Sequence, residues 1–356
     1  MRWVGIPWLL ATLCLSSASW AGASGSNAGE VELTREGKAS IQMALQYLAS
    51  HQRADGSLSG AMGNTTGIVA AACMAWMVNG NLPGEGPYGK NVAKGLDYIL
   101  SCAQSSGFLY KGRDGGSMYH HGLATICLAE AWGHTRDKRL YDKLKRAIEL
   151  IVHCQNDKGG WRYQPKITDD DLSVVVMQLL ALRAAKDAGM AVPKEVIDNA
   201  IGYVGKCHSP KDNDNMSGFS YQPGGPKTWS TTAAGVMSLM LCGNYKANEL
   251  KDSLNYILRC REKKEDKTFF IYGHYYAAQA MYQAGGQGEK YLQYWQKWYP
   301  DISRFIVSKQ LASGGERGRY LFGGGFTYTD DFGAWSTAMC VLVLGIPYRY
   351  LPIYQR

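Results

Sequence analysis

Hydrophobic residues follow two alternating patterns along the chain, and the pair recurs about every 53 residues. In the first pattern apolar residues lie three or four positions apart, which predicts a helix with one polar face. In the second pattern nearly every position is apolar. The first occurs near residues 41–48, 92–99, 144–152, 197–204 and 250–258, and the second at 67–78, 122–132, 172–185, 230–241, 275–284 and 336–344.

Each repeat is therefore expected to be a helical hairpin with one outer and one inner helix. A helix that is apolar all round is buried on every side or spans a membrane, and these segments are too short to span. An open stack of hairpins would expose the inner helices of its end units, so a closed ring is favoured. The sequence predicts an all-α protein: a single α/α toroid of six helical hairpins in two concentric layers, covering residues 36–356.

The last repeat departs from the pattern. Residues 291–310 contain Pro300, which predicts a helix that ends or kinks there. The tail 345–356 is rich in proline and tyrosine and is expected to seal the last hairpin as a strap. Residues 205–228 and 311–333 form the two longest expected loops, and both should lie at the same mouth of the ring.

A four-residue motif recurs in the loops between the two helices of five hairpins: a glycine or apolar residue, an aromatic, any residue and a tyrosine. The copies are Gly107–Tyr110, Gly160–Tyr163, Gly218–Tyr221, Phe269–Tyr272 and Gly325–Tyr328. The first hairpin has only a degenerate form, Gly56–Ser59. These aromatics either pack the glycine loops or line a ligand site. Packing is the more common role.

The N-terminus predicts export. Residues 1–23 combine Arg2, an apolar run and small residues near Ala21 and Ala23, which is the pattern of a cleaved secretory signal peptide. Residues 24–35 are expected to be a flexible segment. The alternative is an uncleaved anchor, but we expect a secreted or periplasmic protein with no membrane span after cleavage.

Composition and cysteine spacing narrow the possible classes. The chain is 46% apolar and 19% charged, which is typical of a globular protein, and its net charge of +8 is scattered, which argues against nucleic acid as a partner. Cys102, Cys154, Cys207 and Cys260 are 52, 53 and 53 residues apart, each at the end of an expected outer helix. Such regularity favours buried thiols over disulfides between helices. We expect no cofactor and no metal, because no C-x-x-C pair occurs.

The ring would bring the N-termini of all inner helices to one opening, where ligand sites are commonly found. Asn, Thr, Asp and Ser there also serve as helix N-caps. Asp169, Asp170 and Asp171 exceed what one cap needs, and mutual repulsion could raise the pKa of one into the range of a proton donor. The candidate catalytic residues are Asp170, Asp171 and Asp331. The candidate ligand-binding residues are His120, His121, Tyr163, Tyr221, Trp229, His274, Tyr275 and Trp335.

Two stretches carry a resemblance to a known family. Gln155–Trp161, and more weakly Gln52–Gly56, resemble the Gln…Gly-x-Trp repeat of the prenyltransferase and squalene cyclase family. The resemblance implies an α/α toroid. Asp169–Leu172 is similar to the Asp-x-Asp-Asp acid motif of the cyclases but has leucine at its last position, and the Asp-x-Cys zinc motif of prenyltransferases is absent, so zinc is not implied.

Three functional hypotheses follow. The main one is an exported toroid that binds an apolar, isoprenoid-like small molecule or a polypeptide segment at its lumen mouth. The first alternative is a terpenoid-cyclase-like enzyme that uses Asp170 or Asp171 as its acid. The second alternative is a glycan-active enzyme, which would need two carboxyl groups about 5 to 10 Å apart, for instance Asp171 and Asp331.

Overall fold

The computed structural model describes residues 31–59, 65–111, 117–213, 215–243, 249–260, 269–322, 333–348 and 351. Within these residues the chain forms twelve α-helices: α1 (Arg35–His51), α2 (Thr66–Met77), α3 (Gly89–Ser101), α4 (Ser117–Thr135), α5 (Lys138–His153), α6 (Leu172–Asp187), α7 (Lys194–Lys206), α8 (Trp229–Leu241), α9 (Glu249–Cys260), α10 (Phe270–Gly285), α11 (Glu289–Ser308) and α12 (Ala334–Gly345). Three short strands, β1 (His208–Ser209), β2 (Gly218–Ser220) and β3 (Lys227–Thr228), lie between α7 and α8.

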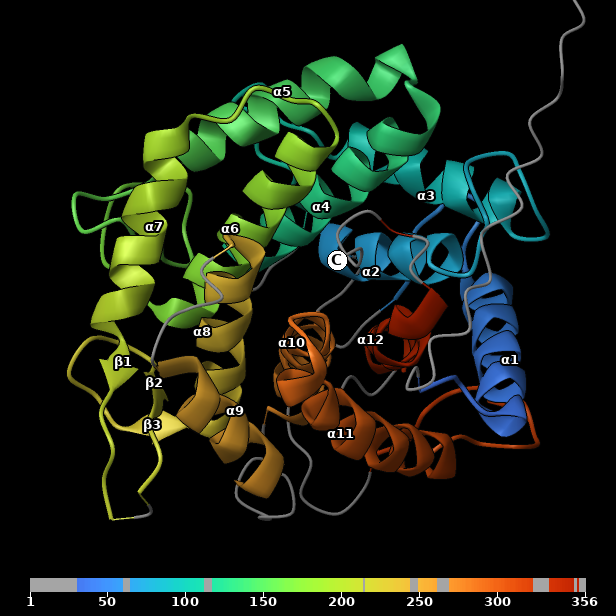
Figure 1. The fold of residues 1–356 in the computed structure, drawn as a ribbon. Helices are drawn as coiled ribbons and strands as arrows, with labels where there is room; N and C mark the ends of the chain where they lie inside the picture. The colour runs from blue at the N-terminus through green and yellow to red at the C-terminus, as the bar shows by residue number, and fades with distance from the viewer. Residues whose placement is uncertain are drawn as a thin grey trace, which may run out of the picture. The chain divides into compact units, whose positions relative to one another are not determined.

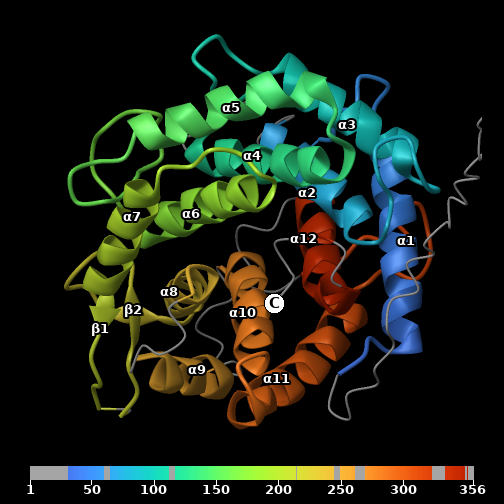
Figure 2. The same ribbon diagram turned by 45° about the horizontal axis from the view of Figure 1, so that its top comes forward.

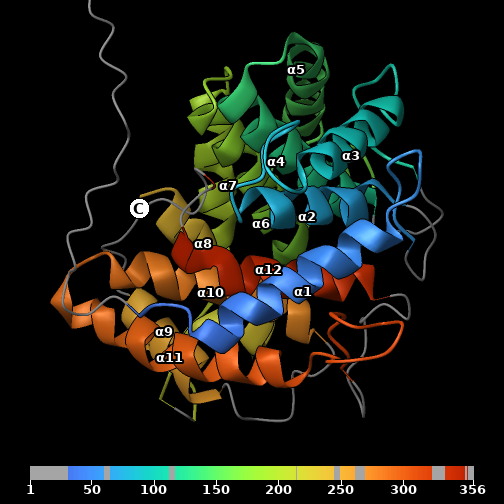
Figure 3. The same cartoon turned by 90° about the vertical axis from the view of Figure 1, so that its right-hand side faces the viewer.

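The even-numbered helices form a closed inner ring, and the odd-numbered helices surround it (Figures 1 and 2). Each inner helix packs against the inner helix before it and the one after it, and α12 packs against α2. The outer ring closes as well, because α1 lies beside α11 and against α12 (Figure 3). The predicted all-α toroid of six hairpins is therefore confirmed.

The two layers differ in burial as the hydrophobic pattern predicts. Every residue of α2 from Thr66 to Met77 is buried. In the outer helix α5 only one face is buried, formed by Leu140, Leu144, Ala147, Ile148 and Ile151. Burial on all sides explains why the inner helices carry so few charges.

A glutamine in the loop of some hairpins ties that loop to the next outer helix. Gln155 Nε2 donates to the carbonyl oxygen of Gly159 in its own loop at 3.1 Å and to that of Val196 in α7 at 2.8 Å. Gln52 makes the same pair of contacts, 3.2 Å to its own loop and 3.0 Å to α3. The Gln…Gly-x-Trp motif is thus a contact between neighbouring hairpins.

The last hairpin repeats this contact against the first. Gln310 Nε2 donates to the Gly318 carbonyl oxygen at 3.0 Å and to the Ser40 carbonyl oxygen of α1 at 2.7 Å. The hydroxyls of Tyr320 and Ser40 also lie 2.7 Å apart. These bonds close the outer layer between the two ends of the repeat array.

Glycine is required where these loops meet the next helix. Gly159 has φ of 93°, and a Cβ there would lie 2.2 Å from the carbonyl oxygen of Asn199. Gly318 has φ of 95°, and its Cβ would lie 2.2 Å from that of Met43. Any larger residue would clash with the backbone of the neighbouring hairpin.

The helix does not end at Pro300, because α11 runs from Glu289 to Ser308 with the proline inside it. Trp298 and Tyr299 before the proline and Ile302 after it are buried on the same side of the helix. Their burial outweighs the cost of about 3 kcal/mol that an interior proline carries.

Two of the expected loops have more structure than the sequence indicated. Residues 205–228 contain the antiparallel sheet β1-β2-β3, in which Phe219 of β2 pairs with His208 and with Thr228. The aromatic copy at Phe269–Tyr272 is the first turn of α10, so Tyr272 belongs to an inner helix.

The last aromatic copy and much of the C-terminal tail lie outside the described residues. Gly325–Tyr328 is not described, but the contact of Gln310 shows that the counterpart of Gly159–Trp161 in the last hairpin is Gly318–Tyr320. Within the tail, Ile346–Tyr348 form one 3-10 turn, and Leu351 is buried.

The cysteines occupy packing positions. None of the seven described cysteines forms a disulfide; six are buried, and Cys242 is half-buried. Burial raises the pKa of Cys154 to about 11, so its thiol stays protonated at neutral pH. The prediction of buried thiols is confirmed for these residues, and Cys260 lacks a described side chain.

No helix among the described residues is long and apolar enough to cross a membrane. The same residues contain no group of three or more His, Cys, Asp or Glu side chains that could hold a metal ion. Residues 1–30, which include the expected signal peptide, lie outside the described part of the chain.

Candidate functional site

Side-chain oxygens cap several inner helices, as the sequence predicts. Thr65 Oγ1 accepts from the backbone N–H of Ile68 at 3.4 Å, and Thr228 Oγ1 accepts from that of Thr231 at 3.3 Å. Asp171 caps α6 in the same way. These polar residues are therefore helix N-caps. Capping uses only one of the two carboxyl oxygens of Asp171, so the contacts of the other oxygen need a separate account.

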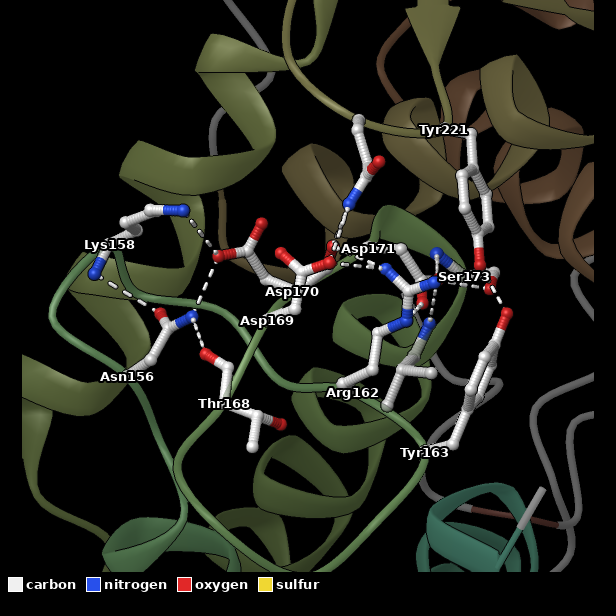
Figure 4. A network of polar contacts seen from close by, with 12 residues as sticks. Asn156, Lys158, Arg162, Tyr163, Thr168, Asp169, Asp170, Asp171, Ser173 and Tyr221 are labelled. Carbon is white, nitrogen blue, oxygen red and sulfur yellow. Dashed lines mark hydrogen bonds and ion pairs between the residues drawn. The ribbon is translucent and has the colours of Figure 1, made fainter. Parts of the chain in front are cut away.

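Asp171 is fully buried at the start of α6 (Figure 4). Its Oδ1 accepts from the backbone N–H groups of Ser173 at 2.9 Å and Val174 at 3.1 Å, and from the Ser173 hydroxyl. Its Oδ2 lies 3.3 Å from Nε of Arg162. Burial raises the pKa of the carboxyl, while these hydrogen bonds and the charge of Arg162 oppose the rise.

The three consecutive carboxylates point in different directions. Asp170 Oδ2 accepts from Asn156 Nδ2 at 2.7 Å and lies 3.7 Å from Lys158 Nζ, on the side of the outer loop. Asp169 is exposed, and its Oδ2 lies 3.0 Å from Nη1 of Arg162. The expected repulsion between crowded carboxylates is therefore wrong as a cause, because burial is what raises the pKa of Asp171.

Arg162 connects this carboxylate to two tyrosines. Its guanidinium lies over the ring of Tyr163, 4.9 Å from the centroid, and over that of Tyr221 at 5.7 Å. The two tyrosine hydroxyls are hydrogen bonded to each other. Tyr163 and Tyr221, both predicted as ligand-binding residues, thus lie together beside Asp171 and are half-buried (Figure 4).

Three further tyrosines meet at the axis of the ring. The Tyr119 hydroxyl at the start of α4 is hydrogen bonded to Ser173 Oγ. Burial raises the pKa of Tyr272 and of Tyr276 on α10, and in both cases the nearby Tyr119 raises it further. Because α4 and α10 lie on opposite sides of the inner ring, these side chains reach across the opening.

Sequence reasoning missed part of this cluster, namely Tyr119, Arg162, Ser173, Tyr272 and Tyr276. Tyr119 directly precedes the candidate pair His120-His121, and Arg162 is the variable position of the aromatic motif. The aromatic motif predicts a loop position for Tyr272, whereas the structure places it in the first turn of α10. The available signal was the spacing of Tyr272 and Tyr276, which places both on one face of a helix.

His121 has a structural role instead of the expected ligand role. Its Nδ1 accepts from the backbone N–H of Leu109 at 3.1 Å, and its Nε2 lies 3.2 Å from the carbonyl oxygen of Ala147 in α5. Burial lowers the pKa of His121 to about 4, so the ring is neutral at pH 7. Both ring nitrogens are occupied, and neither can reach a ligand.

Trp229 and His274 face the outer layer. Trp229 Nε1 donates to the carbonyl oxygen of Ile257 in α9 at 2.9 Å. The ring of His274 packs 4.5 Å from that of Trp229 and 5.9 Å from that of Trp298 in α11. Both residues therefore join the two layers, and neither belongs to the cluster around Asp171.

The remaining candidates are placed as follows. His120 is half-buried, with its ring 5.9 Å from that of Tyr110, Tyr275 is fully buried against Tyr276, and Trp335 is half-buried in α12. Asp331 lies outside the described residues. The separation between Asp171 and Asp331 that glycosidase chemistry would require therefore stays a prediction.

Comparison with known proteins finds likeness in structure alone. No family model and no curated protein sequence matches the chain. An α-1,6-mannanase from a Salegentibacter species has a TM-score of 0.63 at 9% identity, with 88% of this chain and 99% of that chain covered. A cellobiose 2-epimerase from Bacillus thermoamylovorans has a TM-score of 0.62 at 11% identity, covering 87% and 98%.

A type II terpene cyclase from Scytonema is also similar, with a TM-score of 0.57 at 11% identity and coverage of 89% and 98%. At these identities the likeness concerns the fold and does not single out the prenyltransferase and squalene cyclase family. The chain shares the α/α toroid fold with these proteins.

Proposed function

We propose that this toroid is a glycan-active protein that binds a saccharide at the mouth of its ring, with Asp171 as an acid. The observation that carries the proposal is a fully buried carboxyl with a raised pKa inside a cluster of hydroxyl and guanidinium groups. This replaces the apolar ligand favoured from the sequence. The expected signal peptide would bring the protein to extracellular glycans.

The chemistry of the cluster suits a saccharide. Ser173, Tyr163 and Tyr221 offer hydroxyls that can both donate and accept, which matches the groups on a sugar. These hydroxyls are bonded to one another or to Asp171, and each can still accept a further hydrogen bond, which a sugar hydroxyl can donate and an apolar ligand cannot. The half-buried rings of Tyr163 and Tyr221 add apolar faces against which a sugar can pack.

Similar structures support the proposal. Two structures of the mannanase are of variants described as inactive, in which two consecutive aspartates are replaced, and both hold an α-1,6-linked mannooligosaccharide. Consecutive aspartates also mark the entrance to α6 in this chain. An unsaturated glucuronyl hydrolase specific for heparin has a TM-score of 0.57 at 14% identity.

An acid at this place needs a carboxyl that keeps its proton longer than usual, and burial of Asp171 acts in that direction. Glycoside hydrolysis would also need a second carboxyl group about 5 to 10 Å away. We propose Asp331 for that role. Arg162 and Ser173 would hold Asp171 in a fixed orientation toward the bound sugar.

One observation favours a second candidate, an isoprenoid cyclase. Tyr119 and Tyr272 lie near the buried carboxyl of Asp171, and aromatic rings stabilise cations. The similar terpene cyclase was solved with a geranylgeranyl substrate. Against this, the hydroxyls of the cluster would face an apolar chain.

The test is a product assay of the mature chain on α-1,6-mannotriose, cellobiose and a heparin disaccharide, with squalene and a geranylgeranyl compound as competing substrates. Asp171→Asn should abolish turnover of a saccharide, and Asp169→Asn, at an exposed carboxylate, is the matched control. Conversion of an isoprenoid and of no saccharide would favour the second candidate. Equal turnover by Asp171→Asn and the unchanged chain would remove the acid role.

A further inference from the structure

The inward face of α10 continues the cluster around Asp171 deeper into the ring. Tyr272, Tyr276 and Gln279 are four and three residues apart, which puts them on one side of the helix. His274, two residues from both tyrosines, lies on the opposite side and packs against Trp298 of the outer layer. The stripe of Tyr272, Tyr276 and Gln279 therefore faces the ring axis.

All three members of this stripe hold a polar atom without a hydrogen-bond partner among the described residues. One is the hydroxyl of Tyr272. The other two lie on fully buried side chains: the hydroxyl of Tyr276, which is 0% exposed, and Oε1 of Gln279, which is 2% exposed. A buried polar atom left unpaired costs about 1 to 3 kcal/mol, and native proteins rarely tolerate one without a reason.

Two other fully buried tyrosines have hydrogen-bond partners. The hydroxyl of Tyr299 in α11 donates to the carbonyl oxygen of Leu344 at 2.7 Å, and that of Tyr320 lies 2.7 Å from Ser40 Oγ. Tyr203 of α7 also carries a buried hydroxyl without a partner among the described residues, so what sets Tyr276 apart is its place on the inward side of the ring. It lies near Tyr119, whose own hydroxyl is bonded to Ser173 beside Asp171.

We propose that Tyr276 and Gln279 form an inner part of the ligand site and hydrogen bond the uncharged hydroxyls at one end of a saccharide, which enters the ring end-first. The proposal rests on the proposed function and extends the site inward. Tyr276 can donate to or accept from a sugar hydroxyl, and Gln279 Oε1 can only accept. From Tyr272 to Gln279 the stripe covers about 10 Å along α10.

Tyr272 controls access to this inner part. It is half-buried at the mouth, and its ring packs edge to face on Tyr276 with centroids 4.8 Å apart. Since the polar atoms of Tyr276 and Gln279 are buried in this structure, a side chain at the mouth must move for a ligand to reach them. Rotation of Tyr272 away from Tyr276 provides that movement.

The test compares Tyr276→Phe with Tyr299→Phe, because each removes a single buried hydroxyl. Affinity for α-1,6-mannotriose and cellobiose is measured by calorimetry, and the melting temperature by thermal unfolding. Tyr276→Phe should weaken saccharide binding at least tenfold and leave the melting temperature unchanged or higher. Tyr299→Phe should lower the melting temperature and leave the affinity unchanged.

Each other result has a definite meaning. Unchanged saccharide affinity in Tyr276→Phe, with turnover still lost in Asp171→Asn, overturns the inner site and keeps the proposed function. A drop in melting temperature of Tyr276→Phe that matches Tyr299→Phe shows that the hydroxyl is already paired, and it also overturns the inner site. Failure of the unchanged chain to bind any saccharide overturns both proposals.

Discussion

The loop of the third hairpin, residues 155–171, and the loop of the first, residues 52–58, use the same contacts for assembly and differ in everything else. In both, a glutamine side chain donates hydrogen bonds to a carbonyl oxygen of its own loop and to one of the next outer helix. In both, a glycine at positive φ meets the backbone of that helix. Only the third loop adds Arg162, Tyr163 and the three aspartates. Shared features therefore build the ring, and the additions mark the candidate site.

A second shared contact explains His121. In the second hairpin its Nδ1 accepts the backbone N–H of Leu109. Thr232 Oγ1 accepts the equivalent N–H in the fourth hairpin at 3.0 Å, and Thr337 Oγ1 does so in the sixth at 3.2 Å. In three hairpins, a side chain near the start of the inner helix thus accepts a hydrogen bond from a backbone N–H of the preceding loop. His121 makes this contact in the second hairpin.

The largest expected effect tests the shared glycine. Gly318→Ala should lower the free energy of unfolding by more than about 3 kcal/mol, because its Cβ would clash with the backbone at Met43 and its φ is unfavourable. Gly224→Ala is the control, since Gly224 also has positive φ but open space around it, and should cost about 1 kcal/mol. Urea denaturation measures both. Equal losses would mean that the close approach is not maintained in solution.

The pH dependence of stability tests the structural role of His121. Its folded pKa of about 4 lies below the ordinary 6.5, so the unfolded chain takes up the proton more readily. The resulting stability is complete above pH 6.5 and is lost as the pH falls to 4, by on the order of 3 kcal/mol. Unfolding free energies at pH 7 and pH 4 should show this difference, and His121→Thr should remove it. The exposed His153→Gln should leave it unchanged.

Loss of the shared glutamine should have a similar effect wherever it occurs. Gln155→Ala and Gln310→Ala each remove two hydrogen bonds to backbone carbonyls and should each cost about 2 kcal/mol in unfolding free energy. Gln293→Ala, on the exposed face of α11, is the control and should change little. A loss at one site only would show that the contact at ring closure differs from the contact within the array.

The smallest expected effects on stability are those of substitutions at the neighbouring residues Asp170 and Asp171. Asp170→Ala should cost about 1 kcal/mol, because Asp170 accepts from Asn156. Asp171→Asn should cost less at pH 7. The folded pKa of Asp171 is raised, so its stabilising contribution belongs to the protonated form and is lost as the pH rises, and asparagine cannot ionise. Unfolding free energies at pH 7 decide the order, and the reverse order would contradict these roles.

The helices could be predicted from the sequence because burial determines which positions are apolar, and the same pattern of apolar positions recurs in every hairpin. Sequence-based prediction failed at Pro300, where tertiary burial of Trp298 and Ile302 outweighs a local rule. It also misplaced the last glycine loop, because an insertion hides the equivalence of Gly318 and Gly159. Asp171 could be identified from its cap position, but the tyrosine cluster could not be, since Tyr119 and Tyr276 meet only through ring closure.

The bond between Gln310 and Ser40 joins residues 270 positions apart, and this has a consequence for how the protein forms. The earliest helices to be synthesised cannot complete their contacts until the sixth hairpin has emerged, since their final neighbours are near the other end of the chain. Such long-range pairing slows folding. An incomplete chain therefore exposes apolar surface at both ends of the open array, and such surface makes a folding intermediate prone to aggregation.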